Sequence, residues 1–115
     1  MTEKSPLAPN DFPQLPKIDG LRFAVAATGS RYTKRNDLLL MTLCESATVA
    51  GVFTRSDIVA APVQWTRDCI KSGTASAILT NAGNANAFTG QYGQETVLQT
   101  AKAVSYTHLT LPTIE

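Results

Sequence analysis

One ten-residue segment, residues 81–90, constrains the fold of this chain more than any other. It reads Asn-Ala-Gly-Asn-Ala-Asn-Ala-Phe-Thr-Gly, follows the apolar run 77–79 and precedes a helical pattern. Where a strand is followed by a helix, the first helical turn leaves backbone N–H groups unpaired, and the helix dipole adds partial positive charge there. Such a junction can hold an oxyanion or a carboxylate without a formal charge. Residues 81–90, which we call the asparagine motif, therefore predict an anion-binding turn.

The asparagine motif contains two kinds of candidate site residue. Carboxamides do not titrate, so they orient other groups and cannot serve as bases. The residues expected to shape the turn are Asn81, Gly83, Asn84 and Asn86. The Thr89 hydroxyl and the Gly90 N–H can both point at one developing oxyanion, and one such donor lowers a barrier by roughly 3 kcal/mol. A purely structural role stays open, because Thr89 can simply cap the helix that follows an Asn-rich turn.

Alternating apolar residues predict several strands in the first two thirds of the chain. The expected strands are residues 21–27, 38–44, 48–54 and 74–80. A short polar link at 45–47 favours a hairpin between the second and the third of them. Residues 60–65 are expected to be extended, because the residue before Pro62 avoids the helical region.

Two helices complete the predicted fold. Thr66 can cap a short helix that ends near Gly73. From Gly90 onward, the spacing of Val97, Ala101 and Val104 predicts one apolar face of a second helix. The order of these elements predicts an α/β fold in which a mixed sheet is layered with helices.

Composition excludes several classes of function. Hydrophobic residues make up 43% and charged residues 17% of the 115 residues, and the net charge is +1, so we expect a globular protein without a nucleic-acid or membrane partner. The longest uncharged apolar run, 38–44, is too short to cross a bilayer. No secretory signal is recognised at the N-terminus, so a cytoplasmic location is expected.

The cysteines and the single histidine predict no metal site and no resident cofactor. Cys44 and Cys69 lie far apart in the sequence, which excludes a CxxC redox motif, and one histidine is too few for a zinc cage. Two reduced cysteines packed as small hydrophobic residues are expected.

The two ends of the chain differ from its middle. Residues 1–17 carry four of the six prolines and are expected to form an extended lead-in. Residues 105–115 change abruptly to β-branched residues and a proline, and they resemble the translated adaptor sequence that is fused to many truncated gene predictions. We therefore expect a non-native tail there and assign no catalytic role to His108, which lies within it.

Three motifs together resemble one family. Val-Ala-Gly-Val-Phe-Thr at 49–54, Ala-Ala-Pro-Val at 60–63 and the asparagine motif resemble, in order and spacing, the ornithine acetyltransferases, or glutamate N-acetyltransferases, which are bifunctional arginine-biosynthesis proteins. The resemblance covers residues 18–104. It implies part of a self-cleaving αββα-type sandwich, and therefore an incomplete domain.

The resemblance also implies an activity and its partners. Members move an acetyl group from N2-acetylornithine to glutamate, and some also accept acetyl-CoA as a co-substrate. The precursor cuts itself into two chains, and this frees a threonine that forms an acetyl-enzyme. Two alpha and two beta chains then make a heterotetramer.

Within that family, the Thr-Gly step that follows the asparagines supplies the oxyanion hole, so the resemblance carries this role to Thr89 and Gly90. The family's nucleophile lies beyond the matched region. The chain is therefore expected to be an N-terminal fragment of the alpha chain, inactive alone. Two alternatives stay open: a self-cleaving aminopeptidase of related fold, and a non-catalytic small α/β domain.

Overall fold

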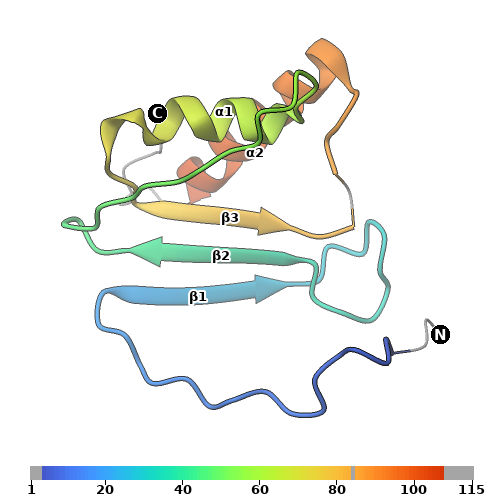
Figure 1. The fold of residues 1–115 in the computed structure, drawn as a ribbon. Helices are drawn as coiled ribbons and strands as arrows, with labels where there is room; N and C mark the ends of the chain where they lie inside the picture. Colours follow the sequence, from blue (N-terminus) through green and yellow to red (C-terminus); the bar gives the residue numbers. More distant parts are fainter. Residues whose placement is uncertain (1–3, 84, 108–115) are drawn as a thin grey trace.

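The computed structural model describes residues 4–83 and 85–107 of the chain. The elements run in the order β1 (Leu21–Ala26), β2 (Leu38–Leu43), α1 (Ala61–Cys69), a 3₁₀ turn η1 (Ile70–Ser72), β3 (Ala77–Asn81) and α2 (Gly90–Thr107). The three strands form one antiparallel sheet in the order β1-β2-β3, and the two helices pack against each other beside it (Figure 1). This arrangement confirms the expected α/β class, but the described sheet is antiparallel throughout and not mixed as expected.

The register of the sheet decides where the asparagine motif lies. Leu38 at the start of β2 pairs with Ala26 at the end of β1 and with Asn81 at the end of β3. Residues 27–37 and the asparagine motif therefore leave the sheet from the same end (Figure 1). These two segments, far apart in the sequence, become neighbours through strand pairing alone.

The strand expected at residues 48–54 is wrong. Only Thr48 makes a β-bridge, to Thr74, and Val49 N–H donates to the Gly73 carbonyl at 2.9 Å. A turn does follow β2, closed by the Ala47 N–H and the Cys44 carbonyl at 3.0 Å. However, β1 and β3 pair with the two edges of β2, so residues 48–54 cannot form the expected hairpin with β2.

The extended segment expected at residues 60–65 is also wrong, because α1 begins at Ala61. Pro62 lies in the first helical turn, where its missing N–H has no intrahelical acceptor to lose and its fixed φ suits a helix. Thr66 is consequently inside α1 and caps nothing. The predicted end of this helical stretch is confirmed: Gly73, with φ 76°, follows η1 in the left-handed conformation.

The last helix begins where the sequence predicts. Its first residue is Gly90, and Val97, Ala101 and Val104 face the sheet as expected. It continues to Thr107, three residues into the segment expected to be non-native. His108 and the rest of that segment lie outside the described residues, and residues 4–17 precede β1 without a helix or strand.

Within the described residues, only one face of the sheet is covered. Phe23, Val25 and Ile78 occupy the other face and are 62%, 59% and 37% exposed. The chain exposes 9705 Å², whereas a monomer of 12.3 kDa typically exposes about 6,100 Å². The domain is therefore incomplete, as expected. Neither described helix is long and apolar enough to cross a membrane.

Candidate active site

Asn86 holds the C-terminal half of the asparagine motif together. Its Oδ1 accepts a hydrogen bond from the Thr89 hydroxyl at 2.5 Å, and its Nδ2 donates to the Gly93 carbonyl at 2.7 Å. Its backbone carbonyl accepts the Ala61 N–H at 3.1 Å, at the first residue of α1. One side chain and its backbone therefore connect the starts of both helices to Thr89.

Gly93 provides the room for this cluster. It lies in the first turn of α2 and is buried. A Cβ built on it would overlap Thr89 Oγ1 and would lie 2.6 Å from Asn86 Oδ1. Because glycine costs about 1 kcal/mol relative to alanine inside a helix, its presence here is explained by this close approach.

Thr89 and Gly90 lie at the very start of α2. The Thr89 carbonyl accepts the Gly93 N–H at 3.3 Å, so Thr89 is the N-cap by its backbone, although its hydroxyl bonds to Asn86 and not to a helical N–H. The Gly90 N–H has no acceptor among the described residues and is exposed. A hydroxyl and an unpaired helical N–H therefore lie on adjacent residues at the positive end of a helix dipole.

The backbone of the motif is shaped by three residues with positive φ. Gly83 has φ 89° and Gly90 φ 55°, but Phe88, with φ 57°, is the only such residue among the described ones that is not a glycine. A left-handed conformation is uncommon for a bulky side chain, and Phe88 is 84% exposed. The turn therefore forces an aromatic ring outward immediately before Thr89.

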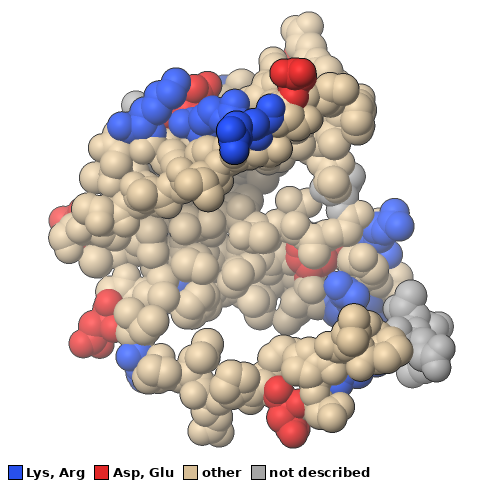
Figure 2. All heavy atoms as spheres, viewed as in Figure 1, with Lys and Arg blue, Asp and Glu red and all other residues tan. Residues whose placement is uncertain are grey.

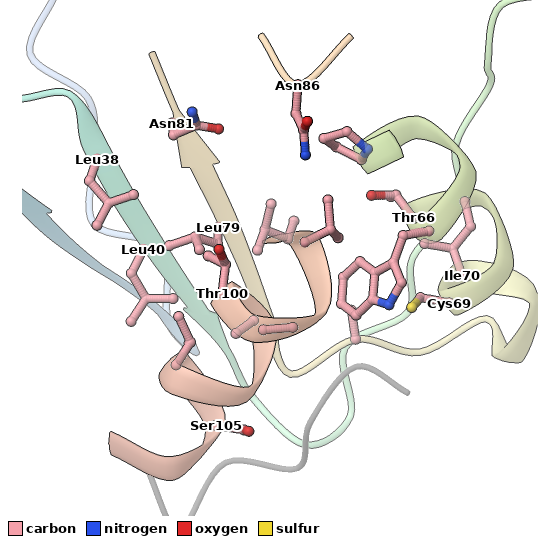
Figure 3. A pocket seen from close by; sticks show the side chains of 18 of the residues that line it. Leu38, Leu40, Thr66, Cys69, Ile70, Leu79, Asn81, Asn86, Thr100 and Ser105 are labelled. Atoms are coloured by element: carbon pink, nitrogen blue, oxygen red, sulfur yellow. The ribbon is translucent and has the colours of Figure 1, made fainter. Parts of the chain in front are cut away.

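Asn81 and Asn84 have different places. Asn81 ends β3 in register with Leu38, and Asn84 lies outside the described residues. Asn81 and Asn86 both border a cavity of about 380 Å³ between the sheet and the helices (Figure 3). Leu38, Leu40 and Leu79 line it from the sheet, and Asn81 and Asn86 lie at the end where the motif leaves the sheet.

Asp37 anchors the segment beside the motif and was not predicted. It is 4% exposed, and its carboxylate accepts the Thr28 N–H at 2.7 Å and the Thr28 hydroxyl at 2.6 Å. These hydrogen bonds hold the pKa of the Asp37 carboxyl below its ordinary value. Its backbone carbonyl accepts the Ala82 N–H at 2.8 Å, which ties the motif to the start of β2.

The sequence carried weak signals for both missed residues. Asp37 is a lone acid directly before an apolar run, and Gly93 interrupts the first turn of a predicted helix. A glycine in such a position often marks a close packing contact. Neither pattern in the sequence indicates which residues Asp37 and Gly93 contact.

The cysteines stand outside this site. Neither forms a disulfide: Cys69 is buried, and burial raises the pKa of its thiol. Cys44 is exposed, contrary to the expectation that both pack as small hydrophobic residues, and the Ser46 hydroxyl at 3.5 Å lowers the pKa of its thiol. Among the described residues, no group of three or more His, Cys, Asp and Glu side chains could hold a metal ion.

Known proteins resemble the chain throughout the described elements. The ArgJ family model matches residues 22–112. The arginine biosynthesis bifunctional protein ArgJ of Nitrobacter winogradskyi is 52% identical over an alignment of 104 residues that covers 87% of this chain and 25% of that protein. That of Ruegeria pomeroyi is 52% identical over an alignment of 110 residues that covers 91% of this chain and 26% of that protein. The chain thus spans about a quarter of the length of these curated relatives.

Two solved structures share the fold. Ornithine acetyltransferase from Mycobacterium tuberculosis, solved in complex with ornithine, is 35% identical with a TM-score of 0.73, over 83% of this chain and 51% of that one. The ArgJ protein from Bacillus halodurans is 30% identical with a TM-score of 0.70, over 82% of this chain and 49% of that one. With the family match over most of its length, these findings show that the chain belongs to the ArgJ family.

Proposed function

We propose that this chain supplies the oxyanion-binding part of an acetyltransferase that moves the acetyl group of N2-acetylornithine to glutamate. The observation that carries the proposal is the adjacency of the Thr89 hydroxyl and the unpaired Gly90 N–H at the start of α2. Family membership and the ornithine bound to the Mycobacterium tuberculosis enzyme support this substrate class over the aminopeptidase and the non-catalytic alternatives.

The same two donors would act twice, because negative charge develops on the acetyl oxygen in each of the two transfer steps. A threonine hydroxyl attacks the amide carbon of N2-acetylornithine, its proton passes to a base, and the carbonyl oxygen becomes an oxyanion. Collapse of this intermediate breaks the C–N bond and releases ornithine as the amine takes up a proton. The glutamate amine then attacks the resulting ester, and a second oxyanion precedes release of N-acetylglutamate and the free hydroxyl.

Thr89 must turn its hydrogen from Asn86 to the oxyanion in this scheme. A hydrogen bond to a charged acceptor is about twice as strong as one between neutral groups, so the developing charge favours the exchange. The Gly90 N–H needs no rearrangement, because it has no acceptor among the described residues. Asn86 then serves as the resting acceptor that keeps the Thr89 side chain in one orientation.

The nucleophilic threonine would lie in the part of the full-length protein that this chain does not span. We infer that a cleaved beta chain supplies it, in an assembly of two alpha and two beta chains, and that acetyl-CoA is an additional acetyl donor in bifunctional members. A cytoplasmic location stays a prediction.

A direct assay tests whether this chain needs the rest of the enzyme for acetyl transfer. The purified 115-residue chain is expected to transfer no acetyl group from N2-acetylornithine to glutamate. A chimera in which it replaces the matching quarter of the Nitrobacter winogradskyi protein is expected to transfer it. Transfer by the chain alone, or an inactive chimera beside an active parent protein, would contradict the proposal.

A further inference from the structure

The segment between β1 and β2 presents a concentration of positive charge. Arg31, Lys34 and Arg35 are all exposed, and we call them the cationic loop. The only acid between residues 28 and 37 is Asp37, whose carboxylate is buried and already accepts two hydrogen bonds from Thr28. Its charge therefore orders the base of the loop and leaves the outer surface cationic.

No carboxylate neutralises these three side chains within the part of the chain that the structure describes. The ion pair in that part joins Lys71 of η1 to Asp68 of α1. Lys and Arg side chains are visible over the region where residues 27–37 lie, at the right of the view (Figure 2). The Arg35 guanidinium stacks 3.9 Å from the centroid of the Tyr32 ring, which fixes its plane and leaves its N–H edges available.

The cationic loop packs directly on the asparagine motif. A Cβ on Gly83 would lie 2.6 Å from Tyr32 Cε2 and 3.2 Å from Arg31 Cδ, so the two segments touch at this glycine. The Asp37 carbonyl accepts the Ala82 N–H at 2.8 Å and fixes the same junction from the other side. Two contacts, at Gly83 and at Ala82, therefore hold the cationic loop against the segment that leads to Thr89.

We propose that Arg31, Lys34 and Arg35 form an anion-binding surface that holds a carboxylate or phosphate group of the substrate beside the asparagine motif. The proposal rests on the acetyl transfer proposed above, whose amino-acid substrates carry carboxylates and whose thioester donor carries phosphates. The guanidinium fork binds either group through two parallel hydrogen bonds, and lysine adds a point charge. Because the three cations are exposed, binding weakens as salt screens them.

The test is a titration of the isotope-labelled 115-residue chain followed by NMR, which also reports its folding. The probes are glutamate, N2-acetylornithine and inorganic diphosphate. At least one of them is expected to shift the amide signals of residues 29–36 and 82–83, with weaker binding as salt rises. The double variant Arg31→Ala, Arg35→Ala is expected to bind roughly tenfold more weakly, whereas Lys102→Ala, which removes an exposed cation from α2, binds like the unchanged chain.

The outcomes separate the two sources of anion. Shifts with the amino acids identify a carboxylate, and shifts with diphosphate alone identify a phosphate. The proposal is overturned if no probe moves these signals, or if the double variant binds as tightly as the unchanged chain. Failure of the acetyl-transfer proposal is distinguishable, because the chimera would then be inactive beside an active parent protein while anion binding by the loop persists.

Discussion

The Thr89 hydroxyl donates a 2.5 Å hydrogen bond to Oδ1 of Asn86, and the same asparagine carboxamide donates to the Gly93 carbonyl at 2.7 Å. A side chain three residues before Thr89 and a carbonyl four residues after it are therefore connected through one amide. Two asparagines of the motif therefore have different roles: Asn86 orients the Thr89 hydroxyl, whereas Asn81 ends β3. It also makes the site sensitive to residues that never touch a substrate.

Replacing Asn86 with alanine is expected to lower the free energy of unfolding by about 1–3 kcal/mol, because it removes the acceptor of the Thr89 hydroxyl and a donor to the Gly93 carbonyl. Urea denaturation measures the change. Gln91→Ala is the control, since its 3.4 Å contact with Glu95 is exposed, and a change within about 0.5 kcal/mol is expected there. Equal effects of the two variants would show that Asn86 does not hold the cluster.

Gly93→Ala is expected to destabilise the chain although alanine is the better helix former. Helix propensity favours alanine by about 1 kcal/mol, but its Cβ would overlap Thr89 Oγ1, and crowding of this kind costs about 1–3 kcal/mol. The cost should shrink in a Thr89→Ala background, where the hydroxyl is absent. A double-mutant cycle measures this coupling, and strictly additive effects would rule it out.

The sequence predicted the parts of the fold that depend on local pattern. β1, β2 and α2 begin where the apolar spacing indicates, and Gly73 ends the α1 and η1 stretch. Residues 48–54 alternate like a strand, but β3 pairs with the edge of β2 that they would need. Which of the two segments pairs there depends on tertiary structure and not on local pattern. Pro62 favours either an extended segment or a helix start, and the contact between Ala61 and the Asn86 carbonyl lies at the observed start.

The candidate site was predicted as a segment and not as a set of contacts. Composition and order pointed to the asparagine motif and to the Thr89–Gly90 step. The links from Asp37 and Gly93 to the motif could not be derived, because they depend on which segments the sheet brings to one end. The cationic loop was missed for the same reason: three cations over five residues are unremarkable in a sequence until Gly83 packs against them.

Acid should weaken the chain through Asp37. Its folded-state pKa is lowered, so its contribution to stability is present above the unfolded pKa and is lost as pH falls through the lower folded pKa. Stability is therefore expected to decrease below about pH 4, where an unfolded aspartate begins to bind a proton. The Asp37→Asn variant should be less stable than the unchanged chain at neutral pH, and its stability should depend less on acid. Thermal unfolding between about pH 2.5 and 7 can measure both effects. An unchanged pH profile in the variant would exclude Asp37 as the source.

Substitutions on the two faces of the sheet should differ in how much they lower the stability of the chain. Phe23→Thr and Val25→Thr alter the uncovered face, where the side chains are 62% and 59% exposed, and each is expected to change stability by less than about 0.5 kcal/mol while reducing self-association. Leu40→Ala, on the face that borders the cavity, is expected to cost about 1–3 kcal/mol. Sedimentation and urea denaturation measure the two properties, and a stability loss at Phe23 as large as that at Leu40 would indicate that its face is covered.

The role of Thr89 as an oxyanion donor can be tested by measuring kcat for acetyl transfer in the Thr89→Ala chimera. Thr89→Ser retains the hydroxyl, and Thr100→Ala is the matched control, since the Thr100 hydroxyl only donates to the Thr96 carbonyl at 2.8 Å. If Thr89 donates to the oxyanion, Thr89→Ala lowers kcat by roughly 10²–10³ with little change in KM, while the serine and control variants stay within about tenfold of the parent. A Thr89→Ala chimera with the parent's kcat would show that Thr89 does not donate to the oxyanion.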